Sequence, residues 1–232
     1  MVSYNRVSLA RKKELDQQDK VSAALAKVLE FTVNHRVKMI GGLVIVFLAI
    51  SVFSGVLYFR SRSEAIAFNE LNQCETKYGE QLKTSGPEEI YASVHADYQR
   101  ILDDHPGTVA AKMARIRLAD ICYLAERFDD AVSLYQQALS DFSDDPFLKN
   151  MILNGLAYSH EALKNSAEAI KHFEAVASDN TSAMRDSALY NLARIYSETG
   201  NTEKSMELYK TLFEDHPDSI YNKFAEEKLS SG

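Results

Sequence analysis

Hydrophobic and polar residues follow two different patterns along the chain. Residues 39–59 read MIGGLVIVFLAISVFSGVLYF, a run of 21 residues without a charged side chain that lies between Lys38 and Arg60. A helix rises about 1.5 Å per residue, so this run is long enough to cross the roughly 30 Å of a bilayer core. Residues 60–232 show no strand-like alternation and read as one helix after another. The pattern predicts an all-α chain with a single transmembrane helix.

The pattern also divides the chain into four segments. We expect a basic tail over residues 1–38, the transmembrane helix over 39–59, a long membrane-proximal helix over 60–86 and a helical domain over 87–232. Gly86-Pro87 ends the long helix, because proline disfavours helix at the residue before it and suits the first turn of the next helix. The apolar run is too long for a signal peptide, so we expect it to remain as an anchor.

Charge is distributed unevenly between the two sides of the apolar run. The chain carries a net charge of −7, but residues 1–38 hold eight Lys/Arg and four Asp/Glu, whereas residues 60–232 hold 18 Lys/Arg and 29 Asp/Glu. Near the span, the N-terminal flank holds Lys20, Lys27, Arg36 and Lys38, whereas the other flank holds Arg60 and Arg62 and little more. The positive-inside rule, which counts Lys and Arg close to the membrane, places the N-terminus in the cytoplasm and residues 60–232 on the other side. The acidic charge of residues 60–232 argues against nucleic acid as a partner, because phosphate binding needs a basic surface.

Two smaller features concern the membrane segment. Ala24, Leu25 and Val28 recur at helical spacing in the tail, which fits either a helix lying on the membrane surface or a plain helical lead-in to the span. Within the span, Ser51 and Gly55 form a small-xxx-small pair. Such a pair allows another helix to approach closely, so we name these two residues as a candidate helix contact.

Residues beyond the apolar run repeat themselves. Segments that begin LADICYLAERF at Leu118, LAYSHEALKNS at Leu156 and LARIYSETGNT at Leu192 align without gaps, at offsets of 38 and 36 residues. Each carries an aromatic residue seventeen positions after its leucine and a small residue thirteen positions after it. A small residue lets two helices approach and the aromatic ring fills the space beside it. Stacked helix pairs of this kind bury their apolar faces against their neighbours.

The repeat resembles the tetratricopeptide repeat. Leu192, Ala193, Tyr196, Gly200 and Ser205 occupy the characteristic places of that family in the last copy, followed by Tyr209 and Pro217. The other two copies are degenerate, and a fourth, more eroded copy precedes Pro106. The resemblance implies an α-solenoid of three to four helix pairs over residues 87–232. The segment from Asp218 to Leu229 is expected to close the stack as a capping helix.

The phrase Asp-His-Pro occurs at residues 104–106 and again at 215–217, where it separates successive repeats. Because Pro106 and Pro217 stand at repeat junctions, we interpret the phrase as a helix stop followed by a new helix, with Thr108 and Ser219 as caps. A metal site needs two or three converging ligands, and these two histidines lie far apart in the sequence. We expect no metal site and no cofactor.

No catalytic motif is present in the sequence. It contains no glycine-rich phosphate loop, no HExxH, no CxxC and no Gly-x-Ser-x-Gly. His95, His160 and His172 have no paired nucleophile, so we expect no enzymatic activity and no small-molecule substrate. Cys74 and Cys122 fit either a disulfide in an oxidising compartment or two small buried hydrophobes, and the sequence does not decide between them.

The family resemblance implies a site. In tetratricopeptide stacks the first helices of the pairs line a concave groove that binds peptides. Carried onto this chain, the groove positions of the three clearest repeats are Met113, Ile116, Asp120 and Tyr123, then Asn154, Tyr158 and Glu161, then Tyr190 and Arg194. Tyrosine, asparagine and arginine suit peptide contacts, although several of these side chains are equally suited to packing between repeats.

The whole arrangement resembles the bacterial ancillary SecYEG translocon subunit family. The resemblance rests on a basic tail, one span near residue 40, a long helix from the membrane and a degenerate tetratricopeptide stack. It implies a single-pass inner-membrane protein with a cytoplasmic N-terminus and a periplasmic domain. Its expected partners are translocon subunits and emerging secretory proteins or periplasmic chaperones.

An alternative function is a cell-envelope scaffold. The phrase Tyr-x-x-hydrophobe-x-x-His-Pro-x-Ser is similar to repeats in families that coordinate cell division or assemble the outer membrane. Those families typically begin with a cleaved or lipidated segment, whereas we expect the apolar run of this chain to remain uncleaved. Translocon association is therefore the first hypothesis and the scaffold is the second.

Overall fold

The computed structural model describes residues 9–231, with side chains from residue 17 onward except those of Asp19, Val21 and Thr32. Residues 1–8 of the predicted basic tail lie outside the described residues. The described part contains ten helices and no strand, which confirms the all-α class. The helices are α1 (Leu9–Asn34), α2 (Arg36–Gln81), α3 (Pro87–Asp104), α4 (Val109–Leu124), α5 (Phe128–Asp141), α6 (Pro146–Ala162), α7 (Ser166–Ala177), α8 (Arg185–Glu198), α9 (Thr202–Asp215) and α10 (Asn222–Ser231).

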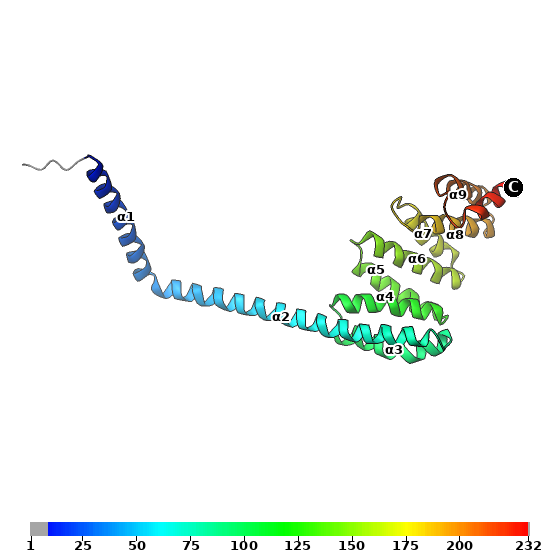
Figure 1. Cartoon of the computed structure of the whole chain (residues 1–232), viewed down its shortest axis with the longest axis horizontal. Coiled ribbons are helices and arrows are strands. Elements are labelled where there is room, and N and C mark those ends of the chain that lie inside the picture. Colours follow the sequence, from blue (N-terminus) through cyan, green and yellow to red (C-terminus); the bar gives the residue numbers. More distant parts are fainter. Residues whose placement is uncertain (1–8, 232) are drawn as a thin grey trace, which may run out of the picture. The chain divides into compact units, whose positions relative to one another are not determined.

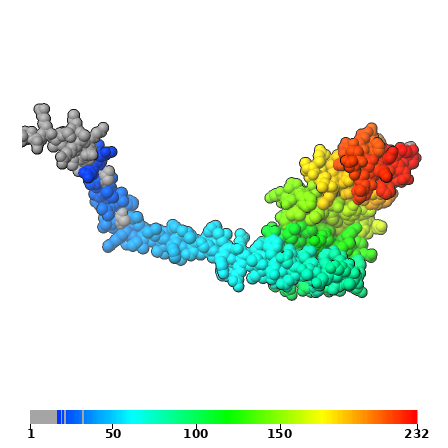
Figure 2. All heavy atoms as spheres, viewed as in Figure 1, coloured from blue at the N-terminus to red at the C-terminus, as the bar shows by residue number. Residues whose placement is uncertain are grey.

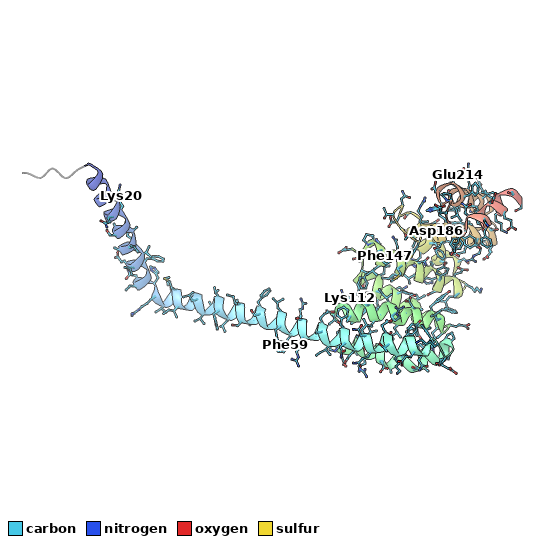
Figure 3. All side chains as sticks on the ribbon, in the orientation of Figure 1. Lys20, Phe59, Lys112, Phe147, Asp186 and Glu214 are labelled. Carbon is cyan, nitrogen blue, oxygen red and sulfur yellow. The ribbon has the colours of Figure 1, made fainter. Side chains whose placement is uncertain are left out.

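The chain forms two compact units, Met1–Arg60 and Ser61–Gly232, and helix α2 contributes to both. In the first unit, the apolar side chains of residues 39–59 have no protein packed around them, and Leu43, Phe47 and Phe59 are each about two thirds exposed. Figure 3 shows the side chains around Phe59 projecting away from the helix. An 18-residue window of α2 has a mean hydropathy of 2.6 and is not buried at all. Among the described residues, α2 is the one helix long and apolar enough to cross a membrane.

The second unit is a stack of four helix pairs and a terminal helix. The end of α2 (residues 61–81) pairs with α3, and the pairs α4/α5, α6/α7 and α8/α9 follow, each packed on the one before. Helix α10 packs against α9 and closes the stack. The helices are therefore adjacent in space in the order in which they occur in the sequence (Figures 1 and 2). This confirms the predicted solenoid and its capping helix. In the eroded first pair, Val94, Tyr98 and Ile101 are fully buried.

The repeated small and aromatic residues form the contacts between helices. Ala131, Ala169 and Ser205 are at most 2% exposed, and Ser205 donates its hydroxyl to the Ala193 carbonyl oxygen at 2.7 Å. Tyr135, Phe173 and Tyr209, four residues further on, are buried beside them. Their rings belong to three successive hydrophobic cores, which join α2 to α6, α6 to α8 and α8 to α10. Each pair therefore buries its apolar face against the next pair.

The two helices of each clear repeat are joined by the same tight turn. Glu126, Lys164 and Gly200 occupy equivalent places and have φ values of 57°, 62° and 85°. In each turn the following N–H donates to a carbonyl five residues earlier: Arg127 to Cys122, Asn165 to His160 and Asn201 to Tyr196, all at 2.8 Å. This is the hydrogen bond of the Schellman motif. Glycine suits its left-handed residue best, so the two degenerate repeats hold a lysine and a glutamate in a conformation that L-residues disfavour.

The two Asp-His-Pro phrases adopt matching turns. His105 and His216 are the C-cap residues of α3 and α9, and their N–H groups donate to carbonyl oxygens four residues earlier. Thr108 caps α4 as predicted, since its hydroxyl oxygen accepts from the Ala111 N–H at 3.1 Å. The predicted cap at Ser219 is wrong, because α10 begins at Asn222 and Ser219 lies in the preceding turn. The Ser219 hydroxyl instead accepts from the Tyr221 N–H at 3.2 Å and donates to the Asp186 carboxylate at 2.6 Å.

Candidate protein-binding face

Helices α4, α6 and α8 are the first helices of their pairs, and we refer to the surface formed by their predicted groove residues as the inner face. Side chains from neighbouring helices meet along it. The rings of Tyr123 and Tyr158 lie 6.5 Å apart, centroid to centroid, and link α4 to α6. Between α6 and α8, Arg194 forms an ion pair with Glu161 at 2.6 Å. The amide nitrogen of Asn191 donates to the Tyr158 hydroxyl at 2.9 Å. The structure therefore joins the predicted residues of three helices in a connected row.

Two residues of the inner face offer unused contacts. Met113 is 37% exposed, so its thioether side chain is available for apolar contact. The side-chain oxygen Oδ1 of Asn154 is shielded from solvent and accepts no hydrogen bond from the protein. A buried acceptor without a donor costs about 1–3 kcal/mol, and a donor that reaches it would recover that energy. Because this oxygen is shielded, the Asn154 side chain would have to turn outward before a donor from another molecule could reach it.

Two other predicted residues serve the packing of the stack. Ile116 is 4% exposed and lies inside the first hydrophobic core, so its side chain does not face solvent. Asp120 accepts a hydrogen bond from the Tyr135 hydroxyl at 2.5 Å, and Arg117 lies 3.6 Å from its other oxygen. Burial raises the pKa of the Asp120 carboxyl, and the bond from Tyr135 opposes that rise. These side chains join α4 to α5 and α6 rather than extending the open face.

The C-terminal end of the inner face is covered by the chain itself. Tyr190 on α8 stacks on Tyr221 with ring centroids 4.6 Å apart, and the ring of Phe224 on α10 lies 5.9 Å away. The ring of Tyr209 meets Tyr190 from the other side at 6.4 Å. Tyr190 therefore belongs to the closing contact with α10, and the open part of the inner face runs from Met113 to Arg194.

The two candidate contact residues of the span lie four residues apart on α2. The Ser51 hydroxyl donates to the Phe47 carbonyl oxygen of its own helix at 2.8 Å. A Cβ added at Gly55 would meet no atom within 4 Å. Ser51 therefore presents little polar surface, and contact of a second helix with this pair stays a prediction.

Both cysteines are free and buried in the first core. Burial raises the pKa of the Cys74 thiol to about 11 and that of Cys122 to about 12, so both groups are protonated at neutral pH. Thiolate is the reactive form of cysteine, so these side chains behave as small hydrophobes.

The sequence analysis missed one cluster of polar residues. His160 on α6 meets Glu168 and His172 on α7, and one side-chain atom from each lies within 4.8 Å of the others. The spacing of Glu168 and His172 by four residues is a signal that places them on one helix face. The position of His160 against them depends on how the two helices pack, which the sequence does not give.

Comparisons with known proteins agree with this architecture. Two sequence profiles, both described as tetratricopeptide repeat, match residues 95–146 and 161–225, about half of the chain together. No match to the chain was found among curated protein sequences. A tetratricopeptide repeat protein from Parabacteroides merdae is similar in structure, with a TM-score of 0.57 and 15% identity over 70% of this chain and 59% of that one. This chain thus aligns with less than two thirds of the length of that protein.

A second solved structure, BtubC (BKLC) from P. vanneervenii, has a TM-score of 0.53 and 13% identity over 74% of this chain and 82% of that one. At these identities the two structures are similar in fold alone. Tetratricopeptide repeats act in protein interaction and are typically non-enzymatic scaffolds. With the repeats matched in sequence and the helix pairs stacked as described, this chain belongs to the tetratricopeptide repeat family.

Proposed function

We propose that this protein is a single-pass inner-membrane adaptor whose repeat domain, on the periplasmic side, binds extended segments of other proteins beside the Sec translocon. The observation that carries the proposal is the open part of the inner face, where the rings of Tyr123 on α4 and Tyr158 on α6 lie 6.5 Å apart, centroid to centroid. Emerging secretory proteins and periplasmic chaperones are the expected partners. The repeat domain acts as the binding module and α2 as the tether.

The chemistry of the inner face supports peptide binding. Two tyrosine rings offer rigid apolar surface with polar edges, which is typical of protein interfaces. The unpartnered Asn154 oxygen would accept a hydrogen bond once its side chain turned outward, and an extended peptide carries a donor at nearly every residue. The pair of Arg194 and Glu161 offers charged groups at the α8 side, where Arg194 is 29% exposed. A peptide laid across α4, α6 and α8 would meet all three kinds of contact.

The apolar window of α2 and the basic residues beside it support the proposed location in the inner membrane. The apolar window of α2 has no protein packed on it, so a lipid environment would satisfy these side chains. The N-terminal flank of the span holds Lys20, Lys27, Arg36 and Lys38 against Arg60 and Arg62 on the other flank, and the positive-inside rule favours the cytoplasm for the more basic flank. The resemblance to the ancillary SecYEG translocon subunit family then supplies the specific partner.

Site-specific photo-crosslinking in native membranes tests the proposal. A crosslinking residue at Tyr158 probes the inner face, and one at Gln137, exposed on the second helix of the preceding pair, is the matched control. A crosslinking residue at Ser54 probes the side of the span near Ser51, with Phe53 on the opposite side as control. Adducts are identified by mass spectrometry after solubilisation in mild detergent.

The expected result is translocon subunits at Ser54, with secretory proteins or periplasmic chaperones at Tyr158, and few adducts at the two control positions. Division or outer-membrane assembly proteins at Tyr158, without translocon adducts at Ser54, would reject translocon association and favour the envelope scaffold. Equal adducts at Tyr158 and Gln137 would show that the inner face is not the binding surface.

A further inference from the structure

The cluster of His160, Glu168 and His172 has the composition of a metal site. The three residues come from the two helices of the third pair, and one ligand atom of each lies within 4.8 Å of the other two. The His172 Nε2 atom is 3.8 Å from the Glu168 Oε2 atom. The two imidazole rings lie nearly parallel, with an interplanar angle of 13° and centroids 5.5 Å apart. Two imidazoles and one carboxylate therefore converge on a single space.

His160 is held there without any partner for its polar atoms. Its side chain is 9% exposed, and both ring nitrogens are shielded from solvent with no hydrogen-bond partner in the protein. A buried polar atom left unpaired costs about 1–3 kcal/mol, and most native structures avoid the cost. A core packing role would be served equally by an apolar side chain. The buried imidazole therefore points to a ligand for one of its nitrogens.

We propose that His160, Glu168 and His172 bind a divalent transition-metal ion, with zinc as the ion that the ligands fit best. Imidazole nitrogen and carboxylate oxygen are usual zinc ligands, whereas calcium and magnesium favour oxygen alone. In a tetrahedral zinc site, neighbouring ligand atoms lie roughly 3.3 Å apart, given bonds of about 2.0–2.2 Å. The present ligand atoms lie within 4.8 Å of one another, so binding requires the side chains to close by up to about 1.5 Å. Three protein ligands leave the fourth position to water.

The ionisation of the cluster suits a metal at neutral pH. Burial, together with the neighbouring His160, lowers the pKa of His172, so its imidazole is neutral and has a free lone pair. A hydrogen bond from Lys171 lowers the pKa of Glu168, so its carboxylate is ionised. Lys171 lies 3.0 Å from the same Glu168 oxygen and competes with the metal. Its side chain is 69% exposed, so it can turn into solvent when the ion binds.

A metal here would fasten α6 to α7. The two helices are joined by the turn at Lys164, whose positive φ is unfavourable for a residue with a side chain. His160 precedes that turn, and Glu168 and His172 follow it, so the ion would bridge the turn from both sides. An ion that binds only the folded state stabilises that state in proportion to its concentration. The ion would thus hold the two helices of the third pair together, which we call the metal clip. This role does not depend on which partner the inner face binds.

Zinc titration of the full-length protein in detergent tests the proposal. The protein is first stripped with a chelator, then titrated with zinc chloride by calorimetry, and with cobalt chloride by visible absorption, which reports a tetrahedral site. His172→Gln and Glu168→Gln remove one ligand each at partly exposed positions, so they leave the core intact. His95→Gln, on α3, is the matched control because it removes a histidine outside the cluster.

The expected result is one zinc ion per chain, with an affinity that falls by more than about tenfold in His172→Gln and in Glu168→Gln, since even the loss of a residue that hydrogen-bonds a metal ligand costs about 10–100-fold. His95→Gln should bind as the unchanged protein does. Zinc should also raise the melting temperature of the unchanged protein but not that of His172→Gln. Absence of saturable one-to-one binding, or equal affinity in His172→Gln and the unchanged protein, would overturn the proposal.

Discussion

Replacing Gly155 by alanine tests the packing between α5 and α6. A Cβ at this position would lie 2.5 Å from the Tyr135 ring, well inside van der Waals contact. The ring has little room to move away, because Tyr135 is 4% exposed and its hydroxyl donates to Asp120 at 2.5 Å. The residue is glycine because the ring of the preceding helix occupies the space of a side chain.

Two opposing effects set the size of the change in unfolding free energy for Gly155→Ala. Alanine in a helix interior is favoured over glycine by about 1 kcal/mol. Overpacking a filled core costs about 1–3 kcal/mol, and a lost hydrogen bond to a charged group adds about 1.5–3 kcal/mol. If the ring of Tyr135 shifts enough to strain its bond to Asp120, the clash outweighs the helix preference. With the clash and the lost bond set against the helix preference, we expect Gly155→Ala to lower the free energy of unfolding by about 1.5–5 kcal/mol.

The matched control is Gly79→Ala in α2, where an added Cβ would meet no atom within 4 Å. There the helix preference acts alone, so stability should rise by about 0.5–1 kcal/mol. Urea unfolding of the full-length protein in detergent, followed by far-ultraviolet circular dichroism, measures both. The same substitution is also made in a Tyr135→Leu variant, which lacks the ring. In that variant, Gly155→Ala should no longer destabilise the protein. If Gly155→Ala stabilises the protein as Gly79→Ala does, the argument from the ring contact is refuted.

Three further predictions concern caps, turns and pH. Thr108→Ala removes the side-chain cap of α4 and should cost about 1 kcal/mol in urea unfolding, whereas Thr108→Ser should cost little. Lys164→Gly should stabilise the protein by up to about 1 kcal/mol because Lys164 has positive φ, and Gly200→Ala should destabilise it by a similar amount for the same reason. The lowered pKa of His172 means that the folded state resists its protonation. The folded state is therefore fully stable with respect to this group above about pH 6.5 and loses stability as the pH falls below that value. In His172→Gln, the melting temperature should fall less steeply as the pH is lowered.

Much of the fold could be predicted because its signals are local. The uncharged run of residues 39–59 and the proline at Pro87 mark the apolar stretch and the start of α3 without reference to the rest of the chain, whereas α2 ends at Gln81, five residues before the predicted end at residue 86. The recurrence of Tyr135, Phe173 and Tyr209 reports a packing contact that every helix pair repeats. A feature that occurs once is harder to find. Ser219 resembled the cap Thr108, yet the chain after Pro217 makes a longer turn before α10 begins.

The site was harder to predict because it depends on contacts between repeats. The family pattern assigned Ile116 and Tyr190 to the groove by position alone. In the structure Ile116 fills the first core and Tyr190 stacks on Tyr221 from the terminal helix. Tyr190 lies in the best-matched repeat, and its ring is covered by Tyr221 and Phe224, which lie outside the repeat pattern. For Ile116, the side of a helix that faces a neighbour changes with small rotations of each pair, which the sequence does not give. His160 and His172 met for the same reason, across a turn that the sequence shows only as a lysine in the place of glycine.

Helix α6 connects the proposed metal clip to the inner face. Tyr158 and Glu161 point toward α4 and α8, whereas His160, between them in sequence, packs against His172 on α7. The ring of Tyr158 also meets Phe173 on α7 edge to face at 5.2 Å. An ion that fixes His160 relative to α7 therefore fixes the rotation of α6 that presents Tyr158. If zinc changes the affinity of the inner face for a peptide, the peptide must change the affinity for zinc by the same factor. A zinc titration with and without bound peptide would measure that factor, and a factor of one would show that the clip supports the stack without influencing the face.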